Sequence, residues 1–254
     1  MEYHTIEEIM RADGLRLVLV QGFPSPWGQA AKAMMEHKGL TFRVGPQAAG
    51  GENPDLVSWA GINSGPVVAW QDEPPVNRWN EIVLLLERLA PERPLVPADG
   101  PLRAQVFGLG HEICGPLGLG WNRRLEMFRP AIESGEPPAA ITSMAAKWGY
   151  FPTDVAAANR RTVATLGLLA ETLKTQRARG SEYFVGDALT AVDFWWTAFS
   201  NMVDLMPPEL CPLDPSLRPL FENVPDVVAD AIDPVLIEHR DRIIHAHFVL
   251  PMEL

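Results

Sequence analysis

The feature that most constrains the fold is a change of pattern at three closely spaced prolines, Pro91, Pro94 and Pro97. Before them, short apolar runs typical of buried strands alternate with runs of helical spacing, and after them only helical spacing remains. Because proline lacks a backbone donor and fixes φ, three in such a short stretch end any regular element. A chain of 254 residues is also long for one domain. The pattern therefore predicts two domains joined by a proline-rich linker.

The part before the prolines predicts a mixed α/β domain. A strand over Leu15–Val20, a helix from Pro26 that ends at Gly39, and a strand over Leu40–Val44 make a β-α-β unit of ordinary length. The remaining predicted elements are a short helix from Asn53-Pro54, a third strand over Val67–Trp70, a clipped fourth strand at Val76 and a helix over Asn77–Leu89.

The part after the prolines predicts helices only, and the most apolar of them, over Leu189–Leu205, is expected in the middle of a bundle. The other predicted helices cover Leu102–Cys114, Ala139–Trp148, Thr153–Arg179, Val224–Ile232 and Pro234–His245. The expected organisation is an N-terminal extension over residues 1–14, an α/β domain over 15–90, a linker over 91–100 and an all-α domain over 101–254.

Charge and composition exclude several classes of partner. The net charge is −11, without a basic patch that carries interleaved aromatic residues, so nucleic acid is not an expected partner. The N-terminus has no apolar core typical of a secretion signal, and no apolar run is long enough to span a membrane. Two distant cysteines, Cys114 and Cys211, suit a reducing compartment and lack metal-ligand spacing. We expect a cytoplasmic protein without a metal site.

Three short motifs carry a resemblance to a known family. They are Ser25-Pro26-Trp27 at a helix start, Gly65-Pro66-Val67 before a strand, and the run from Phe184 to Asp193, Phe-Val-Gly-Asp-Ala-Leu-Thr-Ala-Val-Asp. With this order of elements, nearly the whole chain after residue 14 resembles the cytosolic glutathione transferases. The resemblance implies a thioredoxin-like domain followed by the all-helical C-terminal domain of that family.

Two of these motifs have a structural interpretation of their own. Thr190 and Asp193 have capping-box spacing before an apolar run, so Asp193 is expected to cap a helix rather than to catalyse. Pro66 cannot donate to a sheet, and proline at a strand start suits an edge or a special peptide bond. The resemblance implies a cis bond between Gly65 and Pro66, with the backbone before the proline pairing with the cysteinyl part of glutathione.

Ser25 is the residue on which the predicted function depends. A serine before a proline at a helix start is ordinarily an N-cap. At the positive end of a helix, the same hydroxyl is also suited to stabilise a bound thiolate, which is the nucleophilic form of a thiol. The resemblance to serine-type transferases favours Ser25 as the catalytic residue, and the two roles are compatible. The absence of cysteine from Ser25-Pro-Trp-Gly28 disfavours dithiol redox activity.

The remaining candidates come from the resemblance. Glutathione is expected to contact Trp27, Gly65, Pro66, Val67, Arg78 and Trp79. Arg78-Trp79, flanked by two asparagines, stands where the family usually has Glu-Ser for the γ-glutamyl carboxylate. An arginine at a helix start is suited to bind that carboxylate, although Arg78 as a surface charge and Trp79 as a packing residue are the alternatives. The second-substrate pocket is expected to involve Trp121, Arg124 and Phe128, with Arg123 and Met127 beside them, unless this stretch packs a helix corner.

The leading functional hypothesis is a transferase in which glutathione thiolate, held at Ser25, attacks a small hydrophobic electrophile, as in detoxification. Isomerisation, ether cleavage or dehalogenation would use the same thiolate. The alternative is a non-catalytic binding or scaffold protein of the same fold. The resemblance also implies a homodimer.

Overall fold

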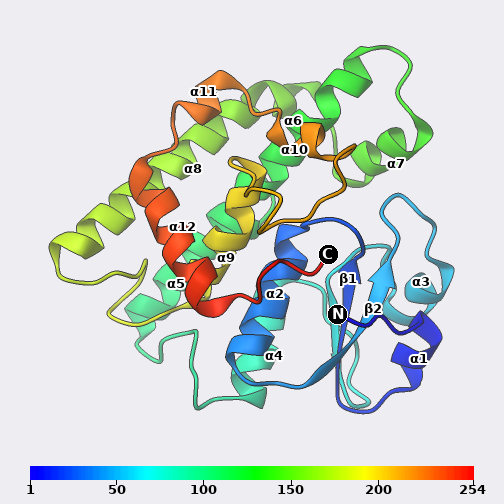
Figure 1. Cartoon of the computed structure of the whole chain (residues 1–254), viewed down its shortest axis with the longest axis horizontal. Helices are drawn as coiled ribbons and strands as arrows, with labels where there is room; N and C mark the ends of the chain where they lie inside the picture. Colours follow the sequence, from blue (N-terminus) through cyan, green and yellow to red (C-terminus); the bar gives the residue numbers. More distant parts are fainter.

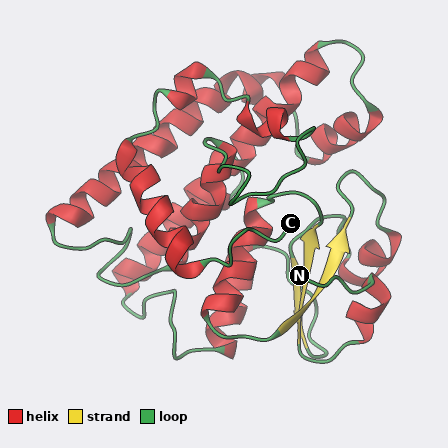
Figure 2. Cartoon of the chain, in the orientation of Figure 1, coloured by secondary structure: helices red, strands yellow, loops and turns green.

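The computed structural model describes residues 1–254, except the side chain of Ala140. Its strands are β1 (Leu15–Val20), β2 (Phe42–Gln47) and β3 (Val67–Trp70). Its helices before the linker are α1 (Ile6–Arg11), α2 (Pro26–His37), α3 (Pro54–Ala60) and α4 (Trp79–Leu89). Those after it are α5 (Gly100–Cys114), α6 (Leu119–Glu133), α7 (Ala139–Lys147), α8 (Pro152–Ala178), α9 (Ala191–Phe199), the 3-10 helix η1 (Ser200–Met202), α10 (Arg218–Glu222), α11 (Asp226–Ala229) and α12 (Pro234–His247). The predicted α/β plus all-α organisation is confirmed, and the sheet and the helical layer are separate in space (Figure 2).

The sheet has the order β2-β1-β3, with β1 parallel to β2 and antiparallel to β3. The predicted strand at Leu40–Val44 in fact runs to Gln47, because its pairing with β1 continues through Gly45 and Pro46. The predicted fourth strand is reduced to a single bridge between Val76 and Val68. Two prolines directly before Val76 lack N–H donors, so no longer ladder forms there.

Alternate residues of β1 divide the sheet between two cores. Leu15, Leu17 and Leu19 face α2 and α4, in a hydrophobic cluster that is continuous with the helical layer. Val18 faces the other side, in a small cluster with residues of α1 and α3. Figure 1 shows α1 and α3 on one side of the strands and α2 on the other, next to α9 and α12.

Helix α9 is buried along its whole length, as its apolar sequence predicts, and α2, α5 and α12 pack against it. It ends at Phe199 and continues only as η1, so it is shorter than predicted. Its N-terminus has the predicted capping box: Asp193 Oδ2 accepts from Thr190 N at 2.7 Å and from Thr190 Oγ1 at 3.0 Å. Asp193 is therefore structural, as expected.

Two helices of the helical domain were not predicted from the sequence. Helix α6 contains an internal proline, Pro130, and short α10 lies in a segment rich in proline. Predicted helix Val224–Ile232 is only the four-residue α11, confined between Pro225 and Pro234. Both α6 and α10 contribute to the candidate site, so these omissions affected the functional prediction more than the fold prediction.

Both chain ends lie against α2. The Met1 amino group is 2.7 Å from Glu253 Oε1, and Glu253 Oε2 is 2.9 Å from Lys32 Nζ on α2. In Figure 1, N and C accordingly lie close together beside the sheet. Tyr3 forms one parallel bridge with Val44, so the N-terminal segment extends the edge of the sheet.

Candidate functional site

Ser25 lies at the start of α2, directly after the loop that follows β1. It occupies the N-cap position, yet its side chain makes no capping hydrogen bond. Its Oγ is buried without a hydrogen-bond partner among the described residues, and only 6% of the residue is exposed. Buried hydroxyls are ordinarily paired, so this one is available to a ligand. Ser25 therefore occupies the N-cap position of α2, but its hydroxyl is not used for capping.

The Gly65–Pro66 peptide bond is cis, as predicted, and it leads into β3. Gly65 lies close to the backbone of β1: a Cβ built on it would be 3.1 Å from Val20 N and 3.3 Å from Leu19 C. The position therefore has little room for a side chain, because the β1 backbone lies directly beside it.

A cavity of about 180 Å³, here called the interdomain cavity, separates this part of the α/β domain from the helical domain. Ser25 and Gly65 both line it. The other lining residues are Val20, Phe23, Pro26, Gln47, Ala49, Gly50, Ser64, Arg124, Met127, Phe128, Met144, Lys147, Trp148, Met202, Leu220 and Phe221.

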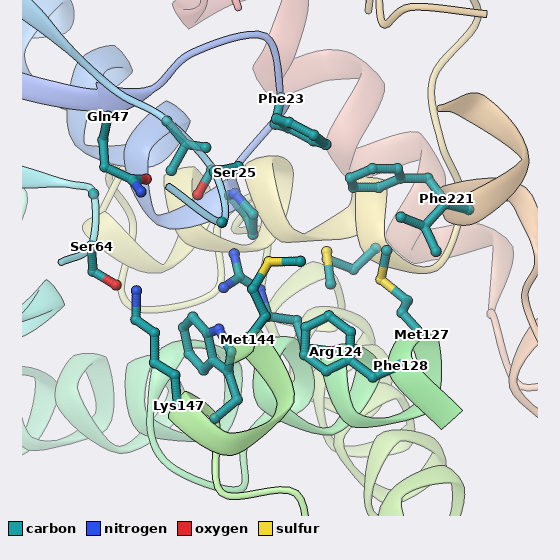
Figure 3. A pocket seen from close by; sticks show the side chains of 18 residues that line it. Phe23, Ser25, Gln47, Ser64, Arg124, Met127, Phe128, Met144, Lys147 and Phe221 are labelled. Atoms are coloured by element: carbon teal, nitrogen blue, oxygen red, sulfur yellow. The ribbon is translucent and has the colours of Figure 1, made fainter. Parts of the chain in front are cut away.

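Polar and apolar side chains gather at different ends of the interdomain cavity. Figure 3 shows Gln47, Ser64, Lys147 and the Arg124 guanidinium toward one end, with Ser25 beside Gln47. The other end is walled by aromatic and methionine side chains, labelled Phe23, Met127, Phe128 and Phe221. No acidic side chain is among the described residues of this wall, although the chain has a net charge of −11. The cavity is therefore suited to an anionic ligand with an apolar part.

The Arg124 guanidinium lies over two neighbouring indole rings, whose centroids are 5.6 Å apart. Its Cζ is 4.6 Å from the centroid of the Trp27 ring and 4.1 Å from that of Trp148. Burial lowers the pKa of Arg124 to about 9. No hydrogen bond or ion pair holds this guanidinium within the described part of the chain. Cation–π contacts with the two rings stabilise the guanidinium, whereas its N–H groups remain available to an acceptor.

Lys147 provides a second cation at the end of α7. Its Nζ donates to the carbonyl of Asn63, which ties α7 to the loop before the cis-proline. Burial, and then the charge of Arg124, lower the pKa of Lys147.

A second cleft begins on the other side of Ser64 and Gly65, which line both sites. Four predicted glutathione contacts, Trp27, Pro66, Arg78 and Trp79, line this cleft. The Arg78 side chain is 74% exposed and lies 3.7 Å from Glu81. Trp79 also packs edge to face on Trp195, with 4.9 Å between ring centroids. Both the binding and the packing interpretation of Trp79 therefore have support.

Three residues that the sequence suggested for the site do not line the interdomain cavity. Val67 lines neither site, because its side chain is buried against α1 and α3. Trp121 packs on Trp148 and lines the second cleft, which residues of both domains form, whereas Arg124 and Phe128 line the interdomain cavity. Arg123, beside Arg124, is fully buried and donates to the Met202 carbonyl at 2.8 Å, so it holds α6 to η1. Arg124, Met127 and Phe128 do line the interdomain cavity.

Sequence reasoning missed several lining residues. One signal existed for Gln47, because it ends a strand parallel to β1 and the carboxyl ends of parallel strands meet at one edge. Met144, Lys147, Trp148 and Phe221 reach the cavity only through the packing of α7 and α10, for which the local sequence has no signal.

Other reactive side chains do not form a site. His239 is buried with its Nε2 3.0 Å from Asp193 Oδ1, so it supports the capping box. Cys114 and Cys211 are free and buried, and burial raises the pKa of both thiols. Among the described side chains, no group of three His, Cys, Asp or Glu is placed to hold a metal ion. No helix in the described chain is long and apolar enough to cross a membrane.

Comparison with solved structures identifies the fold. The chain is similar to a glutathione S-transferase from Methylobacterium radiotolerans in complex with glutathione sulfonate, at a TM-score of 0.63 and 18% identity over 91% of this chain and 90% of the other. It is also similar to a Pseudomonas fluorescens family member with two glutathione bound (TM-score 0.64, 14% identity, coverage 94% and 93%). A third similar structure is a Pseudomonas putida glutathione transferase with one glutathione disulfide bound per subunit, at a TM-score of 0.64 and 15% identity over 94% of this chain and 91% of the other.

No protein-family model matches the sequence, and no curated protein matches it significantly. The resemblance found in the sequence is therefore confirmed through three-dimensional structure, at the level of the two-domain glutathione transferase fold.

Proposed function

We propose that this chain, which has the glutathione transferase fold, binds glutathione and transfers it to a small electrophile. The observation that carries the proposal is the unpartnered Ser25 hydroxyl, buried at the N-terminus of α2 and lining the interdomain cavity. The cis peptide at Gly65 and the solved structures of this fold that contain glutathione support it.

The sulfur, the cysteinyl backbone and the γ-glutamyl carboxylate of glutathione each have a candidate partner in the chain. The Ser25 hydroxyl would donate a hydrogen bond to the sulfur, and the adjacent end of α2 would favour its thiolate form. The peptide groups at Gly65 would pair with the cysteinyl backbone, and Arg78 at the start of α4 would face the γ-glutamyl carboxylate. When bound as thiolate, glutathione would supply the electron pair for a new sulfur–carbon bond, and the leaving group on that carbon, a halide ion in the case of a dinitrophenyl halide, would depart with the electrons of the bond that breaks. The apolar end of the cavity would hold that carbon's substituents away from water.

Titration calorimetry with glutathione tests the proposal, with γ-glutamylcysteine and cysteinylglycine as truncated ligands. We expect binding of glutathione, weaker binding of both truncated forms, and turnover with an electrophile such as a dinitrophenyl halide. Absence of heat at millimolar glutathione would overturn the proposal.

The second candidate is a binding or scaffold protein without catalysis. The observation in its favour is the packing of Trp79 on Trp195, at the place where the resemblance leads one to expect a hydroxyl for the γ-glutamyl group. Glutathione binding without turnover of any electrophile would favour this candidate. We also propose a homodimer, for which an elution mass near the 28.0 kDa of one chain would be contrary evidence.

A further inference from the structure

Arg124 presents a charged group whose partner is not supplied by the described chain. Its guanidinium lies against the neighbouring rings of Trp27 and Trp148, and the residue lines the interdomain cavity. A charged group removed from water is costly unless an opposite charge or hydrogen bonds compensate. The stacked rings compensate part of that cost, and an anion in the cavity would compensate more.

The side chains that line the cavity near Arg124 indicate the chemistry of the rest of the ligand. Phe128 and Met127 follow Arg124 on the same helix and line the cavity with it, while Phe221 and Phe23 close the far end (Figure 3). A ligand that fills this space therefore has an anionic head near Arg124 and an apolar body against aromatic and methionine side chains.

We propose that the second substrate of this protein is a small amphipathic carboxylate, whose carboxylate is bound by Arg124 and whose apolar body lies between Phe23, Phe128 and Phe221. The planar guanidinium, which lies over the Trp27 and Trp148 rings, presents paired N–H groups that match a carboxylate in a bidentate manner. The identity of this ligand as a second substrate rests on the function proposed above, whereas the anion site itself rests on the geometry of Arg124.

Octanoate and its neutral, nearly isosteric amide octanamide separate charge recognition from apolar burial. By calorimetry, we expect the wild type to bind octanoate about 10- to 100-fold more tightly than octanamide, the range for a hydrogen-bonded charge pair. Equal affinities would overturn the proposal without any variant.

Variants then assign the preference to one residue. Arg124→Met is expected to bring the two affinities within about threefold, whereas Arg124→Lys, which keeps the charge, retains part of the preference. Arg103→Met is the matched control, because Arg103 also stacks on an aromatic ring, Phe107, but is exposed outside the cavity. A preference that survives Arg124→Met and is lost in Lys147→Met would overturn the assignment to Arg124.

Competition separates this proposal from the proposed function. Octanoate that still binds in saturating S-methylglutathione supports a second-substrate site. Octanoate that is displaced competitively overturns it, because Arg124 would then hold a carboxylate of glutathione. Octanoate preference in a protein that does not bind glutathione would uphold the anion site and overturn the transferase function. Glutathione turnover in a protein that binds neither octanoate nor octanamide would uphold the transferase function and overturn the anion site.

Discussion

The indole ring of Trp79, at the start of α4, meets that of Trp195 in α9 edge to face, with 4.9 Å between ring centroids. This contact joins the α/β domain to the central helix of the helical domain. Gly110 of α5 lies against both rings: a Cβ built on it would be 2.5 Å from Trp195 Cζ3 and 2.7 Å from Trp79 Cζ3. The absence of a side chain at Gly110 therefore makes the contact between the domains possible.

Gly110→Ala is expected to lower the free energy of unfolding by about 1–3 kcal/mol, because the added methyl group forces one of the two rings to move. Gly108→Ala is the matched control. Gly108 is exposed on the same helix, with nothing within 4 Å of its built Cβ, so alanine there should be neutral or stabilising by up to about 1 kcal/mol. Urea denaturation measures both, and equal effects would contradict the close packing at Gly110.

Ser25→Ala separates the two roles of this hydroxyl. Since the side chain makes no capping hydrogen bond, its removal should change the unfolding free energy by less than about 0.5 kcal/mol. If the hydroxyl donates to the thiolate, turnover should fall about 10- to 100-fold, the value of a hydrogen bond to a charged group. Ser25→Thr, which keeps a hydroxyl, is the control. Undiminished turnover in Ser25→Ala would leave Ser25 without a catalytic role.

Arg78→Ala tests recognition of the γ-glutamyl carboxylate at the start of α4. The side chain is exposed and its only described ion pair, with Glu81, is long at 3.7 Å, so stability should hardly change. The dissociation constant for glutathione should rise about threefold to tenfold. Arg88→Ala is the control, because Arg88 lies at the other end of α4 and pairs with Glu73. Calorimetry that shows the same constant for wild type and Arg78→Ala would leave Arg78 as a surface charge.

The part of the site that the sequence predicts is the part formed by local geometry. Ser25 and Gly65 each stand beside a proline, at a helix start and a strand start, and such places have recognisable signals. The far wall depends instead on the long-range packing of α6, α7 and α10, so the roles of Lys147 and Phe221 had no local signal. The adjacent residues Arg123 and Arg124 show what local sequence cannot predict. Their sequence context is the same, but one helical step directs Arg123 to the core and Arg124 to the cavity.

Asp193→Ala tests the structural role of the capping box in the middle of the helical domain. The carboxylate is fully buried and accepts from Thr190 and from Phe184 N, and it lies 3.0 Å from His239 Nε2. Its removal leaves these donors unpaired, so unfolding free energy should fall by about 3–5 kcal/mol. Asp193→Asn keeps an acceptor oxygen, so its free energy of unfolding should fall by less than that of Asp193→Ala. Specific activity per folded molecule should remain, and a selective loss of activity in stable Asp193→Asn would indicate a role in catalysis.

His37, at the end of α2, predicts how stability changes with pH. Burial, followed by the charges of His247, Arg93 and Lys38, lowers the pKa of His37 to about 4, against a reference value of 6.5. Between these two pH values the unfolded chain binds a proton at His37 and the folded chain does not. The free energy of unfolding therefore falls as the pH is lowered from about 6.5 toward 4, and above about pH 6.5 His37 causes no such loss.

Discounted for its partial exposure, this loss is about 1–2 kcal/mol, and His37→Gln should remove it from the pH profile of the unfolding free energy. Burial also lowers the pKa of His247, whose ring lies 5.2 Å from that of His37, so the double variant should flatten the profile further. A profile of His37→Gln that falls as steeply as that of the wild type between pH 6.5 and 4 would show that other groups bind the protons.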